Sequence, residues 1–301
     1  MKDFFAQLME LTRHELTVML RTRRIALMLA AYQGLALVGG AAVVHMLHAL
    51  EEQATRLITG SDASVGAVGV LGVVFTRAYE EVVALFAGVP YAEMSDILKG
   101  SLVLPIFLWG ALLFVPQLVV ITGFDQVTHE LGNRAMCFRT LRASRTRLLL
   151  GKIIAAVLVH ASLGVLAALA WVTLGTLTLD AMPVSTALLG VLRLGASLIP
   201  LIFCYVAITV LTSCGSREPF RALLAAFSLV GGLWMLGWMA RLPPDHALAP
   251  LRILRWFSPS QHETGLWRAG ILAPAKSFCG YVGLGLVFSA LAARRLARRS
   301  L

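Results

Sequence analysis

Six long apolar runs decide the class of this protein. They cover residues 25–47, 102–124, 153–177, 194–212, 222–240 and 277–293, and each contains few charged side chains. A helix needs about 20 apolar residues to cross a hydrocarbon core roughly 30 Å thick. The runs predict an all-α integral membrane protein with six transmembrane helices, and residues 1–301 are interpreted as one membrane domain.

Composition points to the same class. Apolar residues make up 58% of the chain, charged residues 14%, and the mean hydropathy is +0.80, whereas soluble domains are about 45–50% apolar and about 25% charged. The net charge of +10 does not predict a nucleic-acid partner, because Lys and Arg gather at the ends of the apolar runs. The four cysteines lack metal-ligand or disulfide spacing, so no metal site is expected.

Basic residues flank the runs on one side of the predicted membrane. They are Arg21, Arg23 and Arg24 before the first run; Arg134, Arg139, Arg142, Arg145, Arg147 and Lys152 after the second; Arg217 and Arg221 after the fourth; and Arg294, Arg295, Arg298 and Arg299 after the sixth. Cytoplasmic loops carry such an excess. Both termini are therefore predicted to face the cytoplasm of a cell (inner) membrane, and the more acidic residues 48–101 are predicted to form an external excursion.

A seventh span within residues 65–89 is rejected. It would bury the charges of Arg77, Glu80 and Glu81 near its middle, at a cost of a few kcal/mol each, and would reverse the orientation of the basic segment 134–152. A helical excursion or a shallow re-entrant element is the preferred interpretation.

Residues 1–24 have the pattern of an amphipathic helix at the membrane surface. Phe4, Leu8, Leu11, Val18 and Met19 share one side of a helical wheel, and polar residues share the other, with Glu15 as the exception. A soluble helical tail is the alternative.

Motifs for catalysis are missing. The sequence contains no HExxH, GxSxG or GxxxxGK[ST] pattern, so the chain is not expected to be an enzyme or to bind ATP by a loop of its own, and no cofactor is expected. His160 is the main ionisable residue within a span. It is interpreted as a packed or pore-lining side chain in preference to a proton relay, because no acidic residue lies within helical reach.

The most informative stretch is residues 125–152, between the second and third runs. It begins with Asp125, continues through Glu130 and Gly132, turns near Ala143 and Ser144, and leads into the third run through Leu149-Leu150-Gly151-Lys152. The alternation of polar residues and glycine predicts a short helix across the inner membrane face, followed by a turn. An ordinary positive-inside loop is the alternative.

This pattern resembles the permease subunits of type 2 ATP-binding-cassette exporters. Those permeases carry an acidic start, a glutamate and a glycine, a small-Ser-Arg turn, and L-L-x-G-K at the start of the third span. Asp125, Glu130, Gly132, Ser144-Arg145 and the run Leu148-Leu149-Leu150-Gly151-Lys152 match this order, and the chain departs from it at Asn133-Arg134. The interfacial helix, the six spans and the cytoplasmic ends are also similar to that family's plan.

The resemblance implies a cytoplasmic coupling helix within residues 125–145. Its ATPase-coupling residues would be Asp125, Glu130, Arg134, Arg139, Arg142 and Arg145, of which Glu130 and Arg134 are the favoured contacts. The implied partners are two copies of a separate ABC ATPase subunit carrying ATP and Mg²⁺, a second permease copy or a related permease, and membrane lipid. Residues 241–276, with Trp256-Phe257-Ser258-Pro259, resemble the external re-entrant segment before the last span, for which a packed Pro-rich loop is the alternative.

The resemblance therefore implies an ATP-driven exporter of a hydrophobic or amphipathic substrate. Two other classes stay open: a non-transporting membrane component of an ATPase-driven envelope assembly machine, and an ion-coupled carrier or membrane enzyme. The last class would require charged residues at mid-membrane depth, and the spans contain almost none.

Overall fold

The computed structural model is helical throughout the part of the chain that it describes, with a single isolated β-bridge between Met94 and Arg268. It describes residues 2–21, 23–59, 77, 79–85, 87–99, 103–133, 135–141, 143–178, 184–239 and 254–299. Within these residues, six helices are long and apolar enough to cross a membrane. The all-α class and the six apolar helices are confirmed.

The six long helices correspond one to one to the predicted spans. They are α2 (Arg23–Thr59), α5 (Val103–Gly123), α8 (Arg145–Thr178), α9 (Val184–Ser213), α10 (Pro219–Met239) and α12 (Leu272–Ala297). Three of them extend well into segments predicted as loops. Helix α9 begins at Val184, although the predicted span began at residue 194. Helix α2 continues to Thr59. Helix α8 begins at Arg145, because Ser144 accepts a hydrogen bond from the Arg147 amide at 3.4 Å and the following residues are good helix formers.

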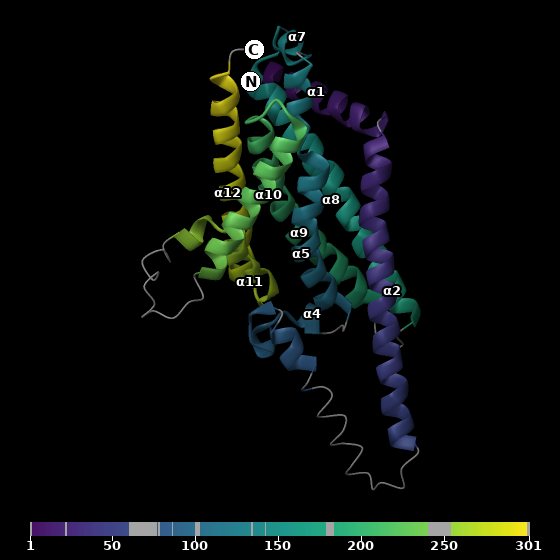
Figure 1. The fold of residues 1–301 in the computed structure, drawn as a ribbon. Helices are drawn as coiled ribbons and strands as arrows, with labels where there is room; N and C mark the ends of the chain where they lie inside the picture. Colours follow the sequence, from purple (N-terminus) through teal and green to yellow (C-terminus); the bar gives the residue numbers. More distant parts are fainter. Residues whose placement is uncertain are drawn as a thin grey trace.

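Helix α9 is the centre of the bundle. It packs against α12, α8, α5 and α10, and its residues Leu201, Ile202 and Ala207 are fully buried. Helix α2 lies at the edge, contacts mainly α8, and extends beyond the other helices at one end (Figure 1). In the stretch Ala26–Val43, most of its surface is exposed and apolar, as expected for a helix that faces lipid.

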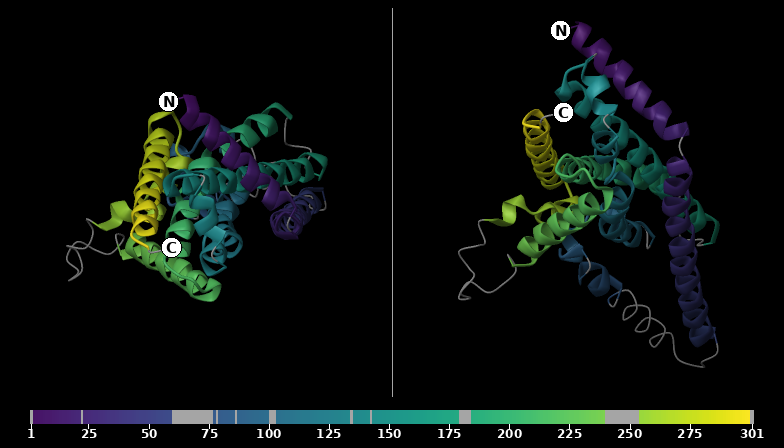
Figure 2. Two further views of the ribbon diagram at one scale, coloured as in Figure 1. Left: turned by 90° about the horizontal axis from the view of Figure 1, so that it is seen from above. Right: turned by 45° about the horizontal axis from the view of Figure 1, so that its top comes forward.

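Three short or surface elements gather at the end of the bundle that holds both termini. Helix α1 (Lys2–Arg21) lies across this end, and α6 (Thr128–Gly132) and α7 (Ala135–Thr140) lie beside it (Figures 1 and 2). The two termini and the 125–145 segment therefore share one side, as the distribution of basic residues predicts.

The opposite end is closed by two segments that lie far apart in the sequence. One comprises η1 (Tyr91–Glu93) and α4 (Asp96–Lys99), and the other η3 (Pro259–His262) and α11 (Glu263–Trp267). The Ser95 amide donates to the Trp267 carbonyl at 3.0 Å, and the Ala269 amide donates to the Glu93 carbonyl at 2.8 Å. These elements are parts of the predicted external segments 48–101 and 241–276, of which residues 60–76 and 240–253 lie outside the described residues.

Candidate functional site

The segment between α5 and α8 is anchored to the end of α9. Helix α5 ends at Gly123, and the Ser213 hydroxyl at the end of α9 accepts hydrogen bonds from the amides of Val127 and Thr128, both at 3.0 Å. The Thr128 hydroxyl donates to the Ser213 carbonyl at 2.9 Å. All three residues are buried. These bonds satisfy amides at the start of α6 that would otherwise lack partners, and they fix where α6 begins.

Four charged side chains meet beneath α6. The Lys152 ammonium lies 2.7 Å from Glu130 Oε1 and 3.0 Å from Glu15 Oε2, and Arg139 Nη1 lies 2.8 Å from Glu130 Oε1 and 2.5 Å from Glu15 Oε1. Positive and negative groups alternate, so the set is neutral. We call Glu15, Glu130, Arg139 and Lys152 the charge quartet; it joins α1, α6, α7 and α8.

The quartet is mostly removed from solvent. The Lys152 side chain is 4% exposed, Glu15 7% and Glu130 12%. Burial alone would raise the pKa of Glu15, but Lys152 and Arg139 outweigh it and hold that pKa below its ordinary value. Glu15 is therefore ionised at neutral pH, and each carboxylate of the quartet has two cationic partners.

Gly151 lets α1 approach α8 closely enough for these contacts. A Cβ at this position would lie 3.1 Å from the Leu11 Cβ. Arg147, one turn earlier on α8, donates to Gln7 and lies over the ring of Phe4. The Gly-Lys pair of the sequence pattern thus has a packing role: the glycine admits α1, and the lysine next to it bonds to Glu15.

A small cavity of about 310 Å³ adjoins the quartet, between α1, α6 and the start of α8. Its wall includes Asp125, Gln126 and His129 as well as Glu15, Glu130 and Lys152. Glu130 Oε2 and Gln126 Oε1 are buried and have no hydrogen-bond partner among the described residues. Two residues of the cavity wall therefore keep a buried acceptor oxygen without a hydrogen-bond partner among the described residues.

The structure places the predicted coupling residues in different surroundings. Glu130 and Arg139 belong to the quartet and face inward, and Asp125 lines the adjoining cavity. Arg145 Nη1 donates to the carbonyls of Leu296, Ala297 and Arg299, at 3.1, 3.0 and 2.9 Å, and so fastens the start of α8 to the end of α12. Arg134 and Arg142 lie outside the described residues.

Two kinds of residue at this end were not predicted to take part in the coupling site. Glu15 and Lys152 are buried ion-pair partners of the predicted coupling residues. For Glu15, the sequence contains one signal: its charge is an exception on the helical wheel of α1. Phe138 and Leu141, in and just after α7, are 73% and 83% exposed. Two large apolar side chains three residues apart within a basic segment are a signal for a contact surface.

His160 is a packed residue within the bundle. Its Nδ1 lies 2.9 Å from the Tyr32 hydroxyl and its Nε2 lies 3.2 Å from the Thr122 hydroxyl, so the ring joins α2, α5 and α8. Neither partner is acidic. Among the described residues, no cluster of His, Cys, Asp and Glu could hold a metal ion.

Comparisons with known proteins leave the site as the main guide to function. Neither a protein-family model nor a curated protein matches this chain.

Proposed function

We propose that this protein is the membrane-spanning subunit of an ATP-driven exporter, in which the 125–145 segment couples the spans to a separate ATPase subunit. The proposal places the protein in the cell (inner) membrane, with both termini and the 125–145 segment in the cytoplasm. ATP and Mg²⁺ bind to the partner, and two such permease chains, identical or related, complete the transporter with two ATPase subunits.

The observation that carries the proposal is the apolar tip of the segment. Helix α7 is the outermost element at its end of the molecule (Figure 1), and Phe138 and Leu141 expose their side chains there. Exposed large apolar residues on a protruding element are typical of a contact surface. The proposal therefore assigns ATPase contact to α7, with Phe138 and Leu141 in addition to the basic residues around them.

Buried contacts behind α7 support a mechanical role. The charge quartet connects the segment to α1 and α8, the Ser213 hydroxyl connects it to α9, and Arg145 connects the start of α8 to α12. A push on α7 would thus reach several spans through short, rigid connections. Such contacts allow ATP-driven closure of a partner to shift the spans between two arrangements.

The family resemblance implies that Glu130 contacts the ATPase directly, whereas this proposal gives it a different role. Its side chain is engaged by Lys152 and Arg139, so it holds the segment in place while α7 meets the partner. Arg134 and Arg142 remain predicted contacts.

The proposed substrate is a hydrophobic or amphipathic molecule, as the sequence predicts. Among the Asp, Glu, Lys, Arg and His residues that the structure describes in the long helices, Lys152 and His160 are the buried ones. This supports an exporter over an ion-coupled carrier, which needs ionisable groups at mid-membrane depth.

The test is assembly and transport with a defined partner. We expect the ATPase subunit encoded beside this chain to copurify with it in detergent and, in inverted vesicles, to drive ATP-dependent accumulation of an amphipathic dye. Phe138→Ala with Leu141→Ala should abolish copurification, whereas Phe220→Ala, an equally exposed phenylalanine at the start of α10, should not. Copurification without ATP-dependent dye or lipid movement would favour the envelope-assembly role, and copurification unaffected by the double variant would refute the assignment of α7.

A further inference from the structure

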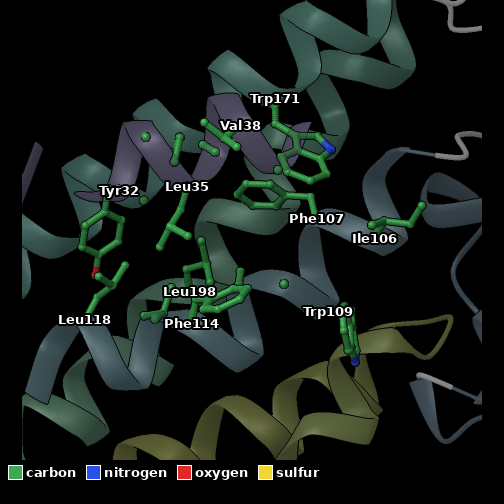
Figure 3. A pocket seen from close by; sticks show the side chains of 18 of the residues that line it. Tyr32, Leu35, Val38, Ile106, Phe107, Trp109, Phe114, Leu118, Trp171 and Leu198 are labelled. Carbon is green, nitrogen blue, oxygen red and sulfur yellow. The ribbon is translucent and has the colours of Figure 1, made fainter. Parts of the chain in front are cut away.

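A second cavity, of about 550 Å³, lies within the bundle between α2, α5, α8 and α9, away from the 125–145 segment (Figure 3). Its volume falls in the range of roughly 300–1,000 Å³ that is usual for small-molecule sites. No charged residue lines it. Leu35, Phe114 and Leu198 are among the side chains that point into it in Figure 3.

Three side chains of the wall carry a polar group: Tyr32, Trp109 and Trp171. The Tyr32 hydroxyl pairs with His160 at 2.9 Å, the Trp171 indole donates to the Val103 carbonyl at 3.2 Å, and Trp109 also has an interaction partner. The cavity therefore presents mainly hydrocarbon and ring faces, which suit neither a headgroup nor an ion. A wall of this kind recognises an apolar chain.

The length of the cavity matches one leaflet of a bilayer. On α2 its wall runs from Tyr32 to Val43, and on α5 from Ile106 to Leu118, which is about 17 Å at 1.5 Å of rise per residue. One leaflet contributes half of a hydrocarbon core roughly 30 Å thick. The residues also lie within two of the candidate spans, so the cavity is at the depth of acyl chains.

The cavity is open toward the surroundings of the bundle. Val38 and Phe114 line it and are 73% and 45% exposed. Gly34 and Gly110 widen it, since a Cβ at either position would meet no atom within 4 Å. An unfilled cavity of this size leaves its wall without contact partners, whereas a chain from the adjoining bilayer would supply them.

We propose that this cavity binds one acyl chain of a membrane phospholipid, inserted between α2 and α5 and closed at one end by the Tyr32–His160 pair. The site is separate from the coupling segment, and the inference holds whether or not the protein is an exporter. The headgroup stays outside the wall, because the wall has no group to pair with it.

Photolabelling of the whole protein in nanodiscs tests the proposal. The probe is phosphatidylcholine with a diazirine midway along one acyl chain, and adducts are located by mass spectrometry. We expect adducts concentrated on the facing sides of α2 and α5. Gly34 and Gly110 are in the wall, and a Cβ at either position meets no atom within 4 Å; Gly34→Leu and Gly110→Leu place a larger side chain there and should each reduce these adducts several-fold. Gly283→Leu, on α12, also meets no atom within 4 Å and should leave them unchanged.

Two results would overturn the proposal. One is equal labelling of Gly110→Leu and the unchanged protein, which would mean that the probe touches the outer surface only. The other comes from benzoylphenylalanine placed at Leu35: a covalent dimer of two chains, instead of a chain carrying one phospholipid, would show that a second copy covers the cavity.

Discussion

At the scale of single residues, the charge quartet is the main buried set of contacts that holds the 125–145 segment against α1 and α8. Two carboxylates and two cations lie together in a mostly buried space, and the charge of each group is neutralised by its partners. Removing one member of a buried pair leaves an uncompensated charge, and this usually costs about 3–5 kcal/mol.

Lys152→Met should therefore lower the apparent Tm by about 5–10 °C. The Tm is measured in detergent by tryptophan fluorescence. The double variant Glu15→Gln with Lys152→Met leaves Glu130 paired with Arg139, so it should be more stable than Lys152→Met alone. Glu10→Gln, on the exposed side of α1, is the control and should change little. A double variant whose loss equals the sum of the two single losses would contradict the coupling within the quartet.

The pH dependence of stability follows from the lowered pKa of Glu15. A carboxyl whose folded-state pKa lies below its unfolded-state value stabilises the fold above the ordinary value of 4.5, and this contribution is lost as the pH falls through the lowered pKa. The Tm difference between the unchanged protein and Glu15→Gln should thus be large at neutral pH and shrink progressively below pH 4.5. A difference that stays constant across this range would mean that Glu15 is not ionised in the folded state.

Ser213→Ala tests the anchor of α6. The substitution removes the acceptor of two buried amides, and each unsatisfied buried group costs about 1–3 kcal/mol. We expect faster hydrogen–deuterium exchange in residues 124–133 with little change in α12. Thr17→Ala, an exposed hydroxyl on α1, should leave the exchange of both regions as it was.

At the scale of elements, two glycines on α10 have opposite surroundings. A Cβ at Gly237 would lie 1.9 Å from the Ser260 hydroxyl, whereas one at Gly232 would meet no atom within 4 Å. Gly237→Ala should therefore lower the apparent Tm because η3 must move away from α10. Gly232→Ala should be neutral or raise the Tm, since alanine gains up to about 1 kcal/mol over glycine in a helix. Equal effects of the two variants would show that η3 is not packed on α10.

The elements were also the part most readily predicted from the sequence. Each long apolar run is one helix of the bundle, because run length and bilayer thickness are tied by the rise of the helix. The extension of α2 to Thr59 was not predicted, since its last turns are polar and no hydropathy signal marks them. The polar residues and glycine of the 125–152 segment predicted a turn near Ala143 and Ser144 but could not show that α8 begins immediately after it.

The charge quartet could not be assembled from the sequence. Glu15 is 137 positions from Lys152 and 124 from Arg139, and its partners depend on how α1 crosses α8. The pattern of residues 125–152 identified Glu130 and Arg139 as functional candidates. It gave no information on which way their side chains point, which depends on the packing of α6 against α1 and α8.

At the scale of the whole molecule, the termini, α1, α6 and α7 lie at one end of the bundle, and η1, α4, η3 and α11 are joined by hydrogen bonds toward the other. The apolar cavity lies between these ends, within the span region. Under the proposed function, the partner ATPase would act at the first end, and the middle of the bundle would be free for an apolar ligand. The proposal therefore predicts an activity that depends on the partner, and its test must include that partner.

The rate of ATP hydrolysis by the proposed partner tests the coupling most directly. The candidate partner, an ABC ATPase subunit encoded next to this chain, is measured in nanodiscs alone, with the unchanged protein, and with Phe138→Glu plus Leu141→Glu. The account predicts that the unchanged protein stimulates hydrolysis several-fold and that the double variant, folded to the same Tm, does not. Stimulation that is absent with the unchanged protein, or undiminished by the double variant, would contradict it.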